Sequence, residues 1–110
     1  EPISAQADFR RLRTLGDAPY DDLLTSRQGT RPARIHYPAW ATTIEFHADP
    51  LLAHWLLFQP PDVPFFALEP QSNANDGFNL YERGLQETGV FVLEPGQSRS
   101  ARAWLRISAP

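Results

Sequence analysis

Proline is the residue that most limits how this chain can fold. The 110-residue sequence contains 11 prolines, about twice the usual share, and they recur at short intervals between Pro19 and Pro95. A proline inside a helix removes a backbone hydrogen bond and clashes with the preceding turn, so no long helix fits between them. The chain must therefore fold from short elements, and we expect most of them to be β-strands.

Two stretches show the alternation of side-chain types that is typical of half-buried strands. In residues 41–47, Thr42, Ile44 and Phe46 fall on one face, and polar side chains fall on the other. In residues 101–107, alanine, leucine and isoleucine alternate with two arginines and a tryptophan. Both stretches are predicted strands of an antiparallel sheet with one face in water.

Three further strands are expected at residues 53–58, 64–69 and 89–93. The first two are nearly continuous apolar runs, as in central strands buried on both faces of a sandwich. Their short proline-rich connection lets them pair directly. Residues 94–97 read Glu-Pro-Gly-Gln, which places proline and glycine where a tight turn needs them. We therefore predict a hairpin over residues 89–107.

Composition excludes several classes of function. The net charge is −3, and all 10 basic residues are arginine, so the chain lacks the basic excess that binds nucleic acid and has no lysine for Schiff-base chemistry. It contains no cysteine for disulfides, thiolate catalysis or zinc–thiolate sites. No apolar stretch reaches the roughly 18 to 20 residues that cross a bilayer, and the first residues show no signal-peptide pattern. We expect a soluble, cytoplasmic protein without nucleic-acid or membrane partners.

Glu69 is the first candidate for chemistry. It ends the apolar run at residues 63–68 and precedes a loop of amides and carboxylates at residues 70–76. A carboxylate fixed at the end of a central strand and partly removed from water has the surroundings that a general base requires. The same pattern also fits a strand-end glutamate that simply turns to solvent.

Aspartates and histidines give weaker signals. Asp21 and Asp22 are adjacent, so on a strand they point to opposite faces and cannot serve one site in the same way, and ordinary turn residues are the alternative. His36, His47 and His54 fall on three different predicted strands without the spacing of a zinc helix. We expect no metal site, a hydrogen-bonded core position for His54 and an exposed position for His47.

Several motifs follow one another in an order that has a known counterpart. They are Phe65–Gln71 (FFALEPQ), Asp76–Asn79 (DGFN), Gly89–Ser98 (GVFVLEPGQS) and Ala103–Ile107 (AWLRI), preceded by Tyr20-Asp21-Asp22 and Ile35-His36-Tyr37. This order resembles the carboxy-terminal part of the aldose 1-epimerases, also called galactose mutarotases. The resemblance covers essentially the whole chain.

The resemblance implies a fold and a mechanism. Members of the family are large antiparallel β-sandwiches that interconvert the α and β anomers of aldoses without a cofactor. Glu69 falls on the family's catalytic base, which takes the proton from the anomeric hydroxyl, and Asp21 on an aspartate that binds sugar hydroxyls. A histidine then protonates the ring oxygen, and the opened sugar closes to the other anomer by general acid–base catalysis.

The family's acid histidine belongs to the half of the fold that precedes this segment, and no histidine here lies on a matching motif. The chain begins at Glu1 without methionine and is much shorter than the family's sandwich. We therefore expect residues 1–110 to be the carboxy-terminal portion of one mutarotase-like β-sandwich domain. It would act on a hexose or hexose phosphate only with the missing portion.

Two other interpretations stay open. One is a non-catalytic carbohydrate-binding module on the same fold, and the other is an interaction domain without a ligand. In each case a partial sandwich leaves sheet edges and one core face uncovered, which favours pairing with another chain. We expect association with a second polypeptide or with a second copy of this chain.

Overall fold

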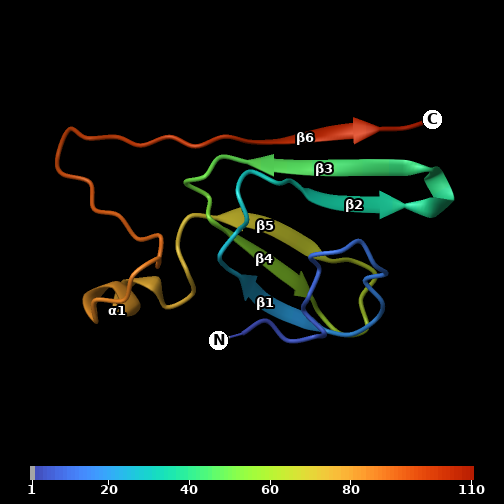
Figure 1. The fold of residues 1–110 in the computed structure, drawn as a ribbon, viewed down its shortest axis with the longest axis horizontal. Helices are drawn as coiled ribbons and strands as arrows, with labels where there is room; N and C mark the ends of the chain where they lie inside the picture. Colours follow the sequence, from blue (N-terminus) through green and yellow to red (C-terminus); the bar gives the residue numbers. More distant parts are fainter. Residues whose placement is uncertain (1) are drawn as a thin grey trace.

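Residues 2–110 are described by the computed structural model, and they form six strands, one α-helix and one 3-10 turn (Figure 1). The expectation of a truncated chain rests on Glu1, which lies outside the described residues. The elements in chain order are β1 (Tyr20–Leu24), β2 (Ala33–Tyr37), η1 (Pro38–Trp40), β3 (Thr42–Ala48), β4 (His54–Gln59), β5 (Ala67–Gln71), α1 (Gly77–Glu82) and β6 (Ala103–Ser108). The structure is nearly all β, as the proline spacing predicts.

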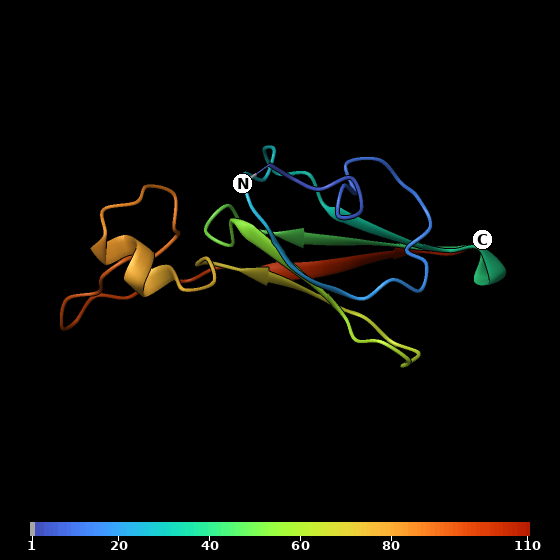
Figure 2. The ribbon, with the colours of Figure 1, turned by 90° about the horizontal axis from the view of Figure 1, so that it is seen from below.

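The strands form two antiparallel sheets of three strands each. One has the order β1-β4-β5 and the other has the order β2-β3-β6. The two sheets meet where the Phe46 ring of β3 packs edge-on against the Trp55 ring of β4, with 5.2 Å between ring centroids. Figure 2 shows α1 at one end of the molecule, beyond the ends of the strands.

The core is small and centres on one face of β4. Trp55, Leu57 and Gln59 alternate along this strand and are all buried. Tyr20 on β1 lies opposite Gln59 and adds its ring to the same face. Period-two alternation therefore accounts for the buried face of this sheet. No helical segment in the described part of the chain has the length and apolar character that a membrane span requires.

Three predicted strands are confirmed within one or two residues, namely those observed as β3, β4 and β6. The strand predicted at residues 64–69 begins only at Ala67 and continues to Gln71. It pairs directly with β4, as expected, but it is an edge strand because β4 lies between it and β1. The expectation that both strands are central holds for β4 alone.

The hairpin predicted over residues 89–107 is wrong. The turn itself forms, since the Gln97 amide donates to the Glu94 carbonyl at 2.9 Å, but residues 89–93 are not in a strand. Instead β6 pairs with β3, from Thr43 opposite Ser108 to Ala48 opposite Ala103. This partner offers β6 a matching apolar face along six residues, whereas Gly89 has a φ of +76° and packs against the Ser72 backbone instead of entering a strand.

Candidate functional site

Glu69 lies in the middle of β5, with its side chain exposed to solvent. Its position differs from the expected one in two ways, because the strand is an edge and the residue is third of five rather than last. The carboxylate accepts a hydrogen bond from Gln71 Nε2 at 3.4 Å. Glu69 is therefore well placed to meet a ligand from solvent, and the partial desolvation expected for it is not present.

Asp21 is the second residue of β1, and its side chain is also exposed. Asp22 follows it on the same strand, so the two carboxylates point to opposite faces, as expected for adjacent strand residues. The alternative of two ordinary turn aspartates is wrong, since β1 runs from Tyr20 to Leu24.

The strand register brings Asp21 and Glu69 to the same face of their sheet. Asp21 lies opposite Phe58, and Glu69 lies opposite Leu56. Directly opposite residues of an antiparallel pair share a face, and so do residues two apart on one strand. The two carboxylates therefore stand on either side of β4, with Leu56 and Phe58 between them. From strand spacing and rise, their Cα atoms are about 12 Å apart.

His54 lies on this same face, at the start of β4 and opposite Gln71. Its side chain is 3% exposed, and neither ring nitrogen has a hydrogen-bond partner among the described residues. The prediction of a core position is confirmed, but the prediction that the ring is hydrogen-bonded is wrong. A buried imidazole without partners costs roughly 1 to 3 kcal/mol in lost solvation.

The other histidines lie on the second sheet. His47 is half-buried rather than exposed, and its ring stacks on the Trp104 ring with centroids 5.1 Å apart. His36 contacts Thr43 through Nδ1 and Oγ1 at 2.9 Å. In residues 2–110, no three side chains of the types that ligate metals come together.

The polar loop after β5 borders a shallow, open depression of about 430 Å³. The Phe78 ring at its rim is 74% exposed, and Asn79 Nδ2 donates to Asp76 Oδ1. Gln71 joins the depression to Glu69. The lining residues are Gln71, Asn73, Ala74, Asn75, Asp76, Gly77, Phe78 and Asn79.

Amides, a carboxylate and an exposed aromatic ring together suit a ligand that has several hydroxyls on a ring, such as a sugar. An amide both donates to and accepts from hydroxyls, a carboxylate accepts from them, and an aromatic face packs against the apolar face of a sugar ring. The sequence shows that this loop is polar, but it does not predict a depression beside it.

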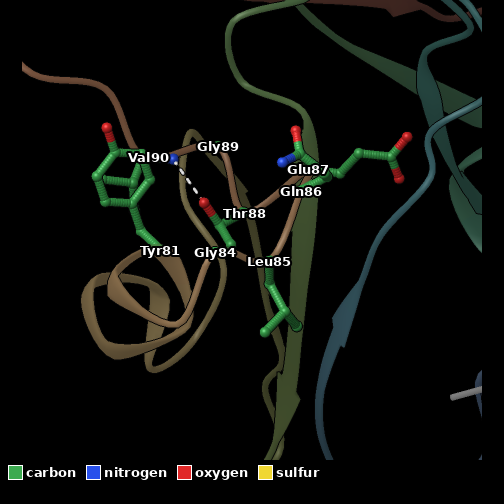
Figure 3. A pocket seen from close by; sticks show the side chains of 8 residues that line it. All are labelled: Tyr81, Gly84, Leu85, Gln86, Glu87, Thr88, Gly89 and Val90. Carbon is green, nitrogen blue, oxygen red and sulfur yellow. Dashed lines mark hydrogen bonds between the residues drawn. The ribbon is translucent and has the colours of Figure 1, made fainter.

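A second, smaller and open depression of about 230 Å³ is shown in Figure 3. It is lined by Tyr81 and by residues 84–90. Thr88 is buried there, its carbonyl accepts from the Ala74 amide at 2.7 Å, and its hydroxyl accepts from the Val90 amide at 3.3 Å. Gly89 packs directly against the Ser72 backbone. Residues 84–90 therefore fix the loop that lines the larger depression.

Sequence reasoning missed this role because it assigned Gly89 to a strand. A glycine at the start of an apolar run also signals close approach of another backbone segment, and that signal was available.

Comparisons of the chain with protein-family models, with curated proteins and with solved structures found no match. The function proposed below rests on the sequence motifs and on the positions of these side chains.

Proposed function

We propose that this chain is the base-bearing, carboxy-terminal portion of an aldose 1-epimerase-like isomerase that interconverts the anomers of a hexose or hexose phosphate. The observation that carries the proposal is the shared face of Asp21 and Glu69 on either side of β4. The order of motifs around Glu69 supports it. In this proposal the two sheets are part of a larger antiparallel sandwich of the mutarotase type.

The two carboxylates have different tasks in the proposed reaction. Glu69 takes the proton from the anomeric hydroxyl, and its exposed position gives a sugar direct access. Asp21 accepts hydrogen bonds from hydroxyls and fixes the orientation of the ring. Leu56 and Phe58 form the apolar strip between them, on which the less polar face of a pyranose packs. The bond between C1 and the ring oxygen breaks and forms again, with proton transfers and no net oxidation or reduction, so the proposed reaction uses no cofactor.

In this proposal the general acid comes from outside this chain. His54 shares the face of Glu69, but a side chain that is 3% exposed cannot reach the ring oxygen of a bound sugar. His36 and His47 lie on the other sheet. In this proposal the amino-terminal portion supplies the histidine, as the family resemblance implies.

Anomer exchange tests the assignment. We would follow the exchange of glucose and galactose anomers by NMR, with the chain joined to its amino-terminal portion. Glu69→Gln is expected to lower the catalysed rate about 10²- to 10⁴-fold, the contribution of one general base. Glu45→Gln is the matched control, because Glu45 lies on the other sheet. An unchanged rate in the Glu69 variant would refute the base assignment.

Asp21 allows a second comparison within a single strand. Asp21→Asn is expected to weaken saccharide binding, whereas Asp22→Asn, on the opposite face of β1, leaves it unchanged. Equal effects of the two substitutions would contradict the proposed binding face.

A non-catalytic carbohydrate-binding module is the second candidate. The amide-lined depression and the exposed Phe78 ring favour it, because they suit saccharide binding without providing an acid. Calorimetry and polarimetry separate the two functions. A binding module gives a measurable heat of saccharide binding in calorimetry. It leaves the rate of mutarotation, followed by polarimetry, at its uncatalysed value.

A further inference from the structure

The Glu69 carboxylate has one hydrogen-bond partner among residues 2–110, the carboxamide of Gln71. Gln71 Nε2 donates to Glu69 Oε2 at 3.4 Å. The two residues are two apart on β5, so both side chains stand on the same face of the strand. This contact occupies Oε2 and leaves Oε1 open to a ligand.

Gln71 is held more firmly than Glu69. The Glu69 side chain is exposed, and an exposed glutamate samples several rotamers. Gln71 is half-buried and lies directly opposite the buried His54 across the β4–β5 pair. Facing side chains of an antiparallel pair have Cβ atoms about 4.5 to 5.5 Å apart, so the His54 ring limits the positions open to Gln71. Pro70, between the two β5 residues, restricts the backbone as well.

No other group among the described residues competes for the Gln71 carboxamide. The side chain makes no second hydrogen bond with residues 2–110, and the facing His54 nitrogens have no partner there. Its second N–H and its carbonyl oxygen are therefore free. Because Gln71 also lines the open depression beside β5, it has two possible tasks, which are to orient Glu69 or to bind the sugar directly.

We propose that Gln71 is a positioning residue, which holds the Glu69 carboxylate so that Oε1 accepts the proton of the anomeric hydroxyl. The inference rests on the proposed function and adds a second residue to it. The proton returns from Oε1 to the sugar when the ring closes. A separation of 3.4 Å is long for such a bond, and contacts of this kind often shorten when the substrate is bound. Fixing the base in one orientation accelerates proton transfer without strengthening sugar binding.

Gln71→Met tests this role, because methionine has the length of glutamine but no hydrogen-bond donor. With the chain joined to its amino-terminal portion, NMR measurement of galactose anomer exchange gives kcat and KM. We expect kcat to fall about tenfold, the effect of one lost hydrogen bond to a charged group, and KM to stay within about twofold. A raised KM with an unchanged kcat would overturn the proposal and make Gln71 a sugar-binding residue.

Two further variants separate the donor from the bulk of the side chain. Gln71→Lys keeps a donor of sufficient length, so it should recover part of the kcat that Gln71→Met loses. Gln86→Met is the matched control at an exposed glutamine on the smaller depression, and it should leave both constants unchanged. Urea denaturation shows whether each variant is folded. Equal losses of kcat in the folded Met and Lys variants of Gln71 would contradict a role for the donor.

The contact itself is testable in residues 1–110 without any measurement of activity. In a ¹H–¹⁵N NMR spectrum, Glu69→Ala should shift the side-chain amide signals of Gln71, because their acceptor is lost. The side-chain amide signals of Gln86 should not move. Unchanged Gln71 signals would refute the contact and the positioning role with it.

Glu69→Gln distinguishes a failure of this inference from a failure of the proposed function. An unchanged exchange rate in Glu69→Gln overturns both. A large loss in Glu69→Gln together with an unchanged rate in Gln71→Met overturns the positioning role alone and leaves Glu69 as the base.

Discussion

Replacing Gly89 by alanine tests whether residues 84–90 hold the polar loop at residues 71–79 in place. Gly89 has a φ of +76°, and a Cβ built on it would lie 1.8 Å from the Ser72 carbonyl oxygen. Real contacts of this kind are at least 3.0 Å, so the two backbone segments must separate by more than 1 Å. That movement breaks the hydrogen bond from the Ala74 amide to the Thr88 carbonyl.

The magnitude follows from these contacts. A left-handed conformation costs an alanine about 1 to 2 kcal/mol, the lost hydrogen bond about 1 kcal/mol, and the remaining overpacking about 1 to 3 kcal/mol. The expected loss in the free energy of unfolding is about 4 kcal/mol. With a urea m-value of about 2 kcal/mol per molar, the unfolding midpoint falls by about 2 M.

Gly84 provides the matched control. Its φ is +79°, and a Cβ there would meet no atom within 4 Å. Gly84→Ala therefore has the backbone strain without the collision, and it should cost about 1 to 2 kcal/mol. Urea denaturation followed by tryptophan fluorescence measures both variants. Equal losses would show that Gly89 is needed only for its φ and would refute the proposed contact.

Two further predictions concern arginines. Arg27 donates to the carbonyl oxygens of Ala48, Asp49 and Leu52. Arg27→Lys loses the planar fork of donors, so it should lower the free energy of unfolding, measured by urea denaturation, by about 2 kcal/mol. Arg31→Lys, at an exposed arginine, should leave it unchanged, and equal losses in the two variants would contradict the contacts. Hydrogen bonds from the Arg10 side chain and amide hold the pKa of the Asp8 carboxyl well below its usual range. Because this pKa is lowered on folding, its small contribution to stability is present above the usual aspartate range and is lost as the pH falls through the lowered value. Arg10→Gln should raise the Asp8 pKa, measured by NMR titration, and an unchanged titration would argue against the pair.

Local patterns predicted β3, β4, β5 and β6, but they did not predict β1 and they placed a strand at residues 89–93, where none forms. They also did not predict all of the strand partners. Alternation identified β3 and β6, because the period of two is a property of a few consecutive residues. The short connection between β4 and β5 predicted their pairing for the same reason. The partner of β6 is set by a different rule. Its register with β3 joins Thr43 to Ser108, and such distant pairing depends on the matching of whole faces.

The candidate site shows the same limit. Asp21 and Glu69 were identified from their neighbours in sequence, but their shared face depends on the register of two strands against β4. The missing hydrogen bonds of His54 also have no local signal. They depend on which groups the fold brings to its ring nitrogens, and it brings none among the described residues.

The two outer strands β5 and β6 differ in how open they are to further pairing. Strand β5 contains Pro70, which has no backbone N–H to offer a neighbouring strand, beside the exposed charge of Glu69. Both features discourage strand addition, so the face of Glu69 stays open to a small ligand. Strand β6 contains no proline, and Leu105 and Ile107 lie exposed along it. Its edge is therefore suited to another strand, and pairing there leaves the carboxylate face of the other sheet accessible.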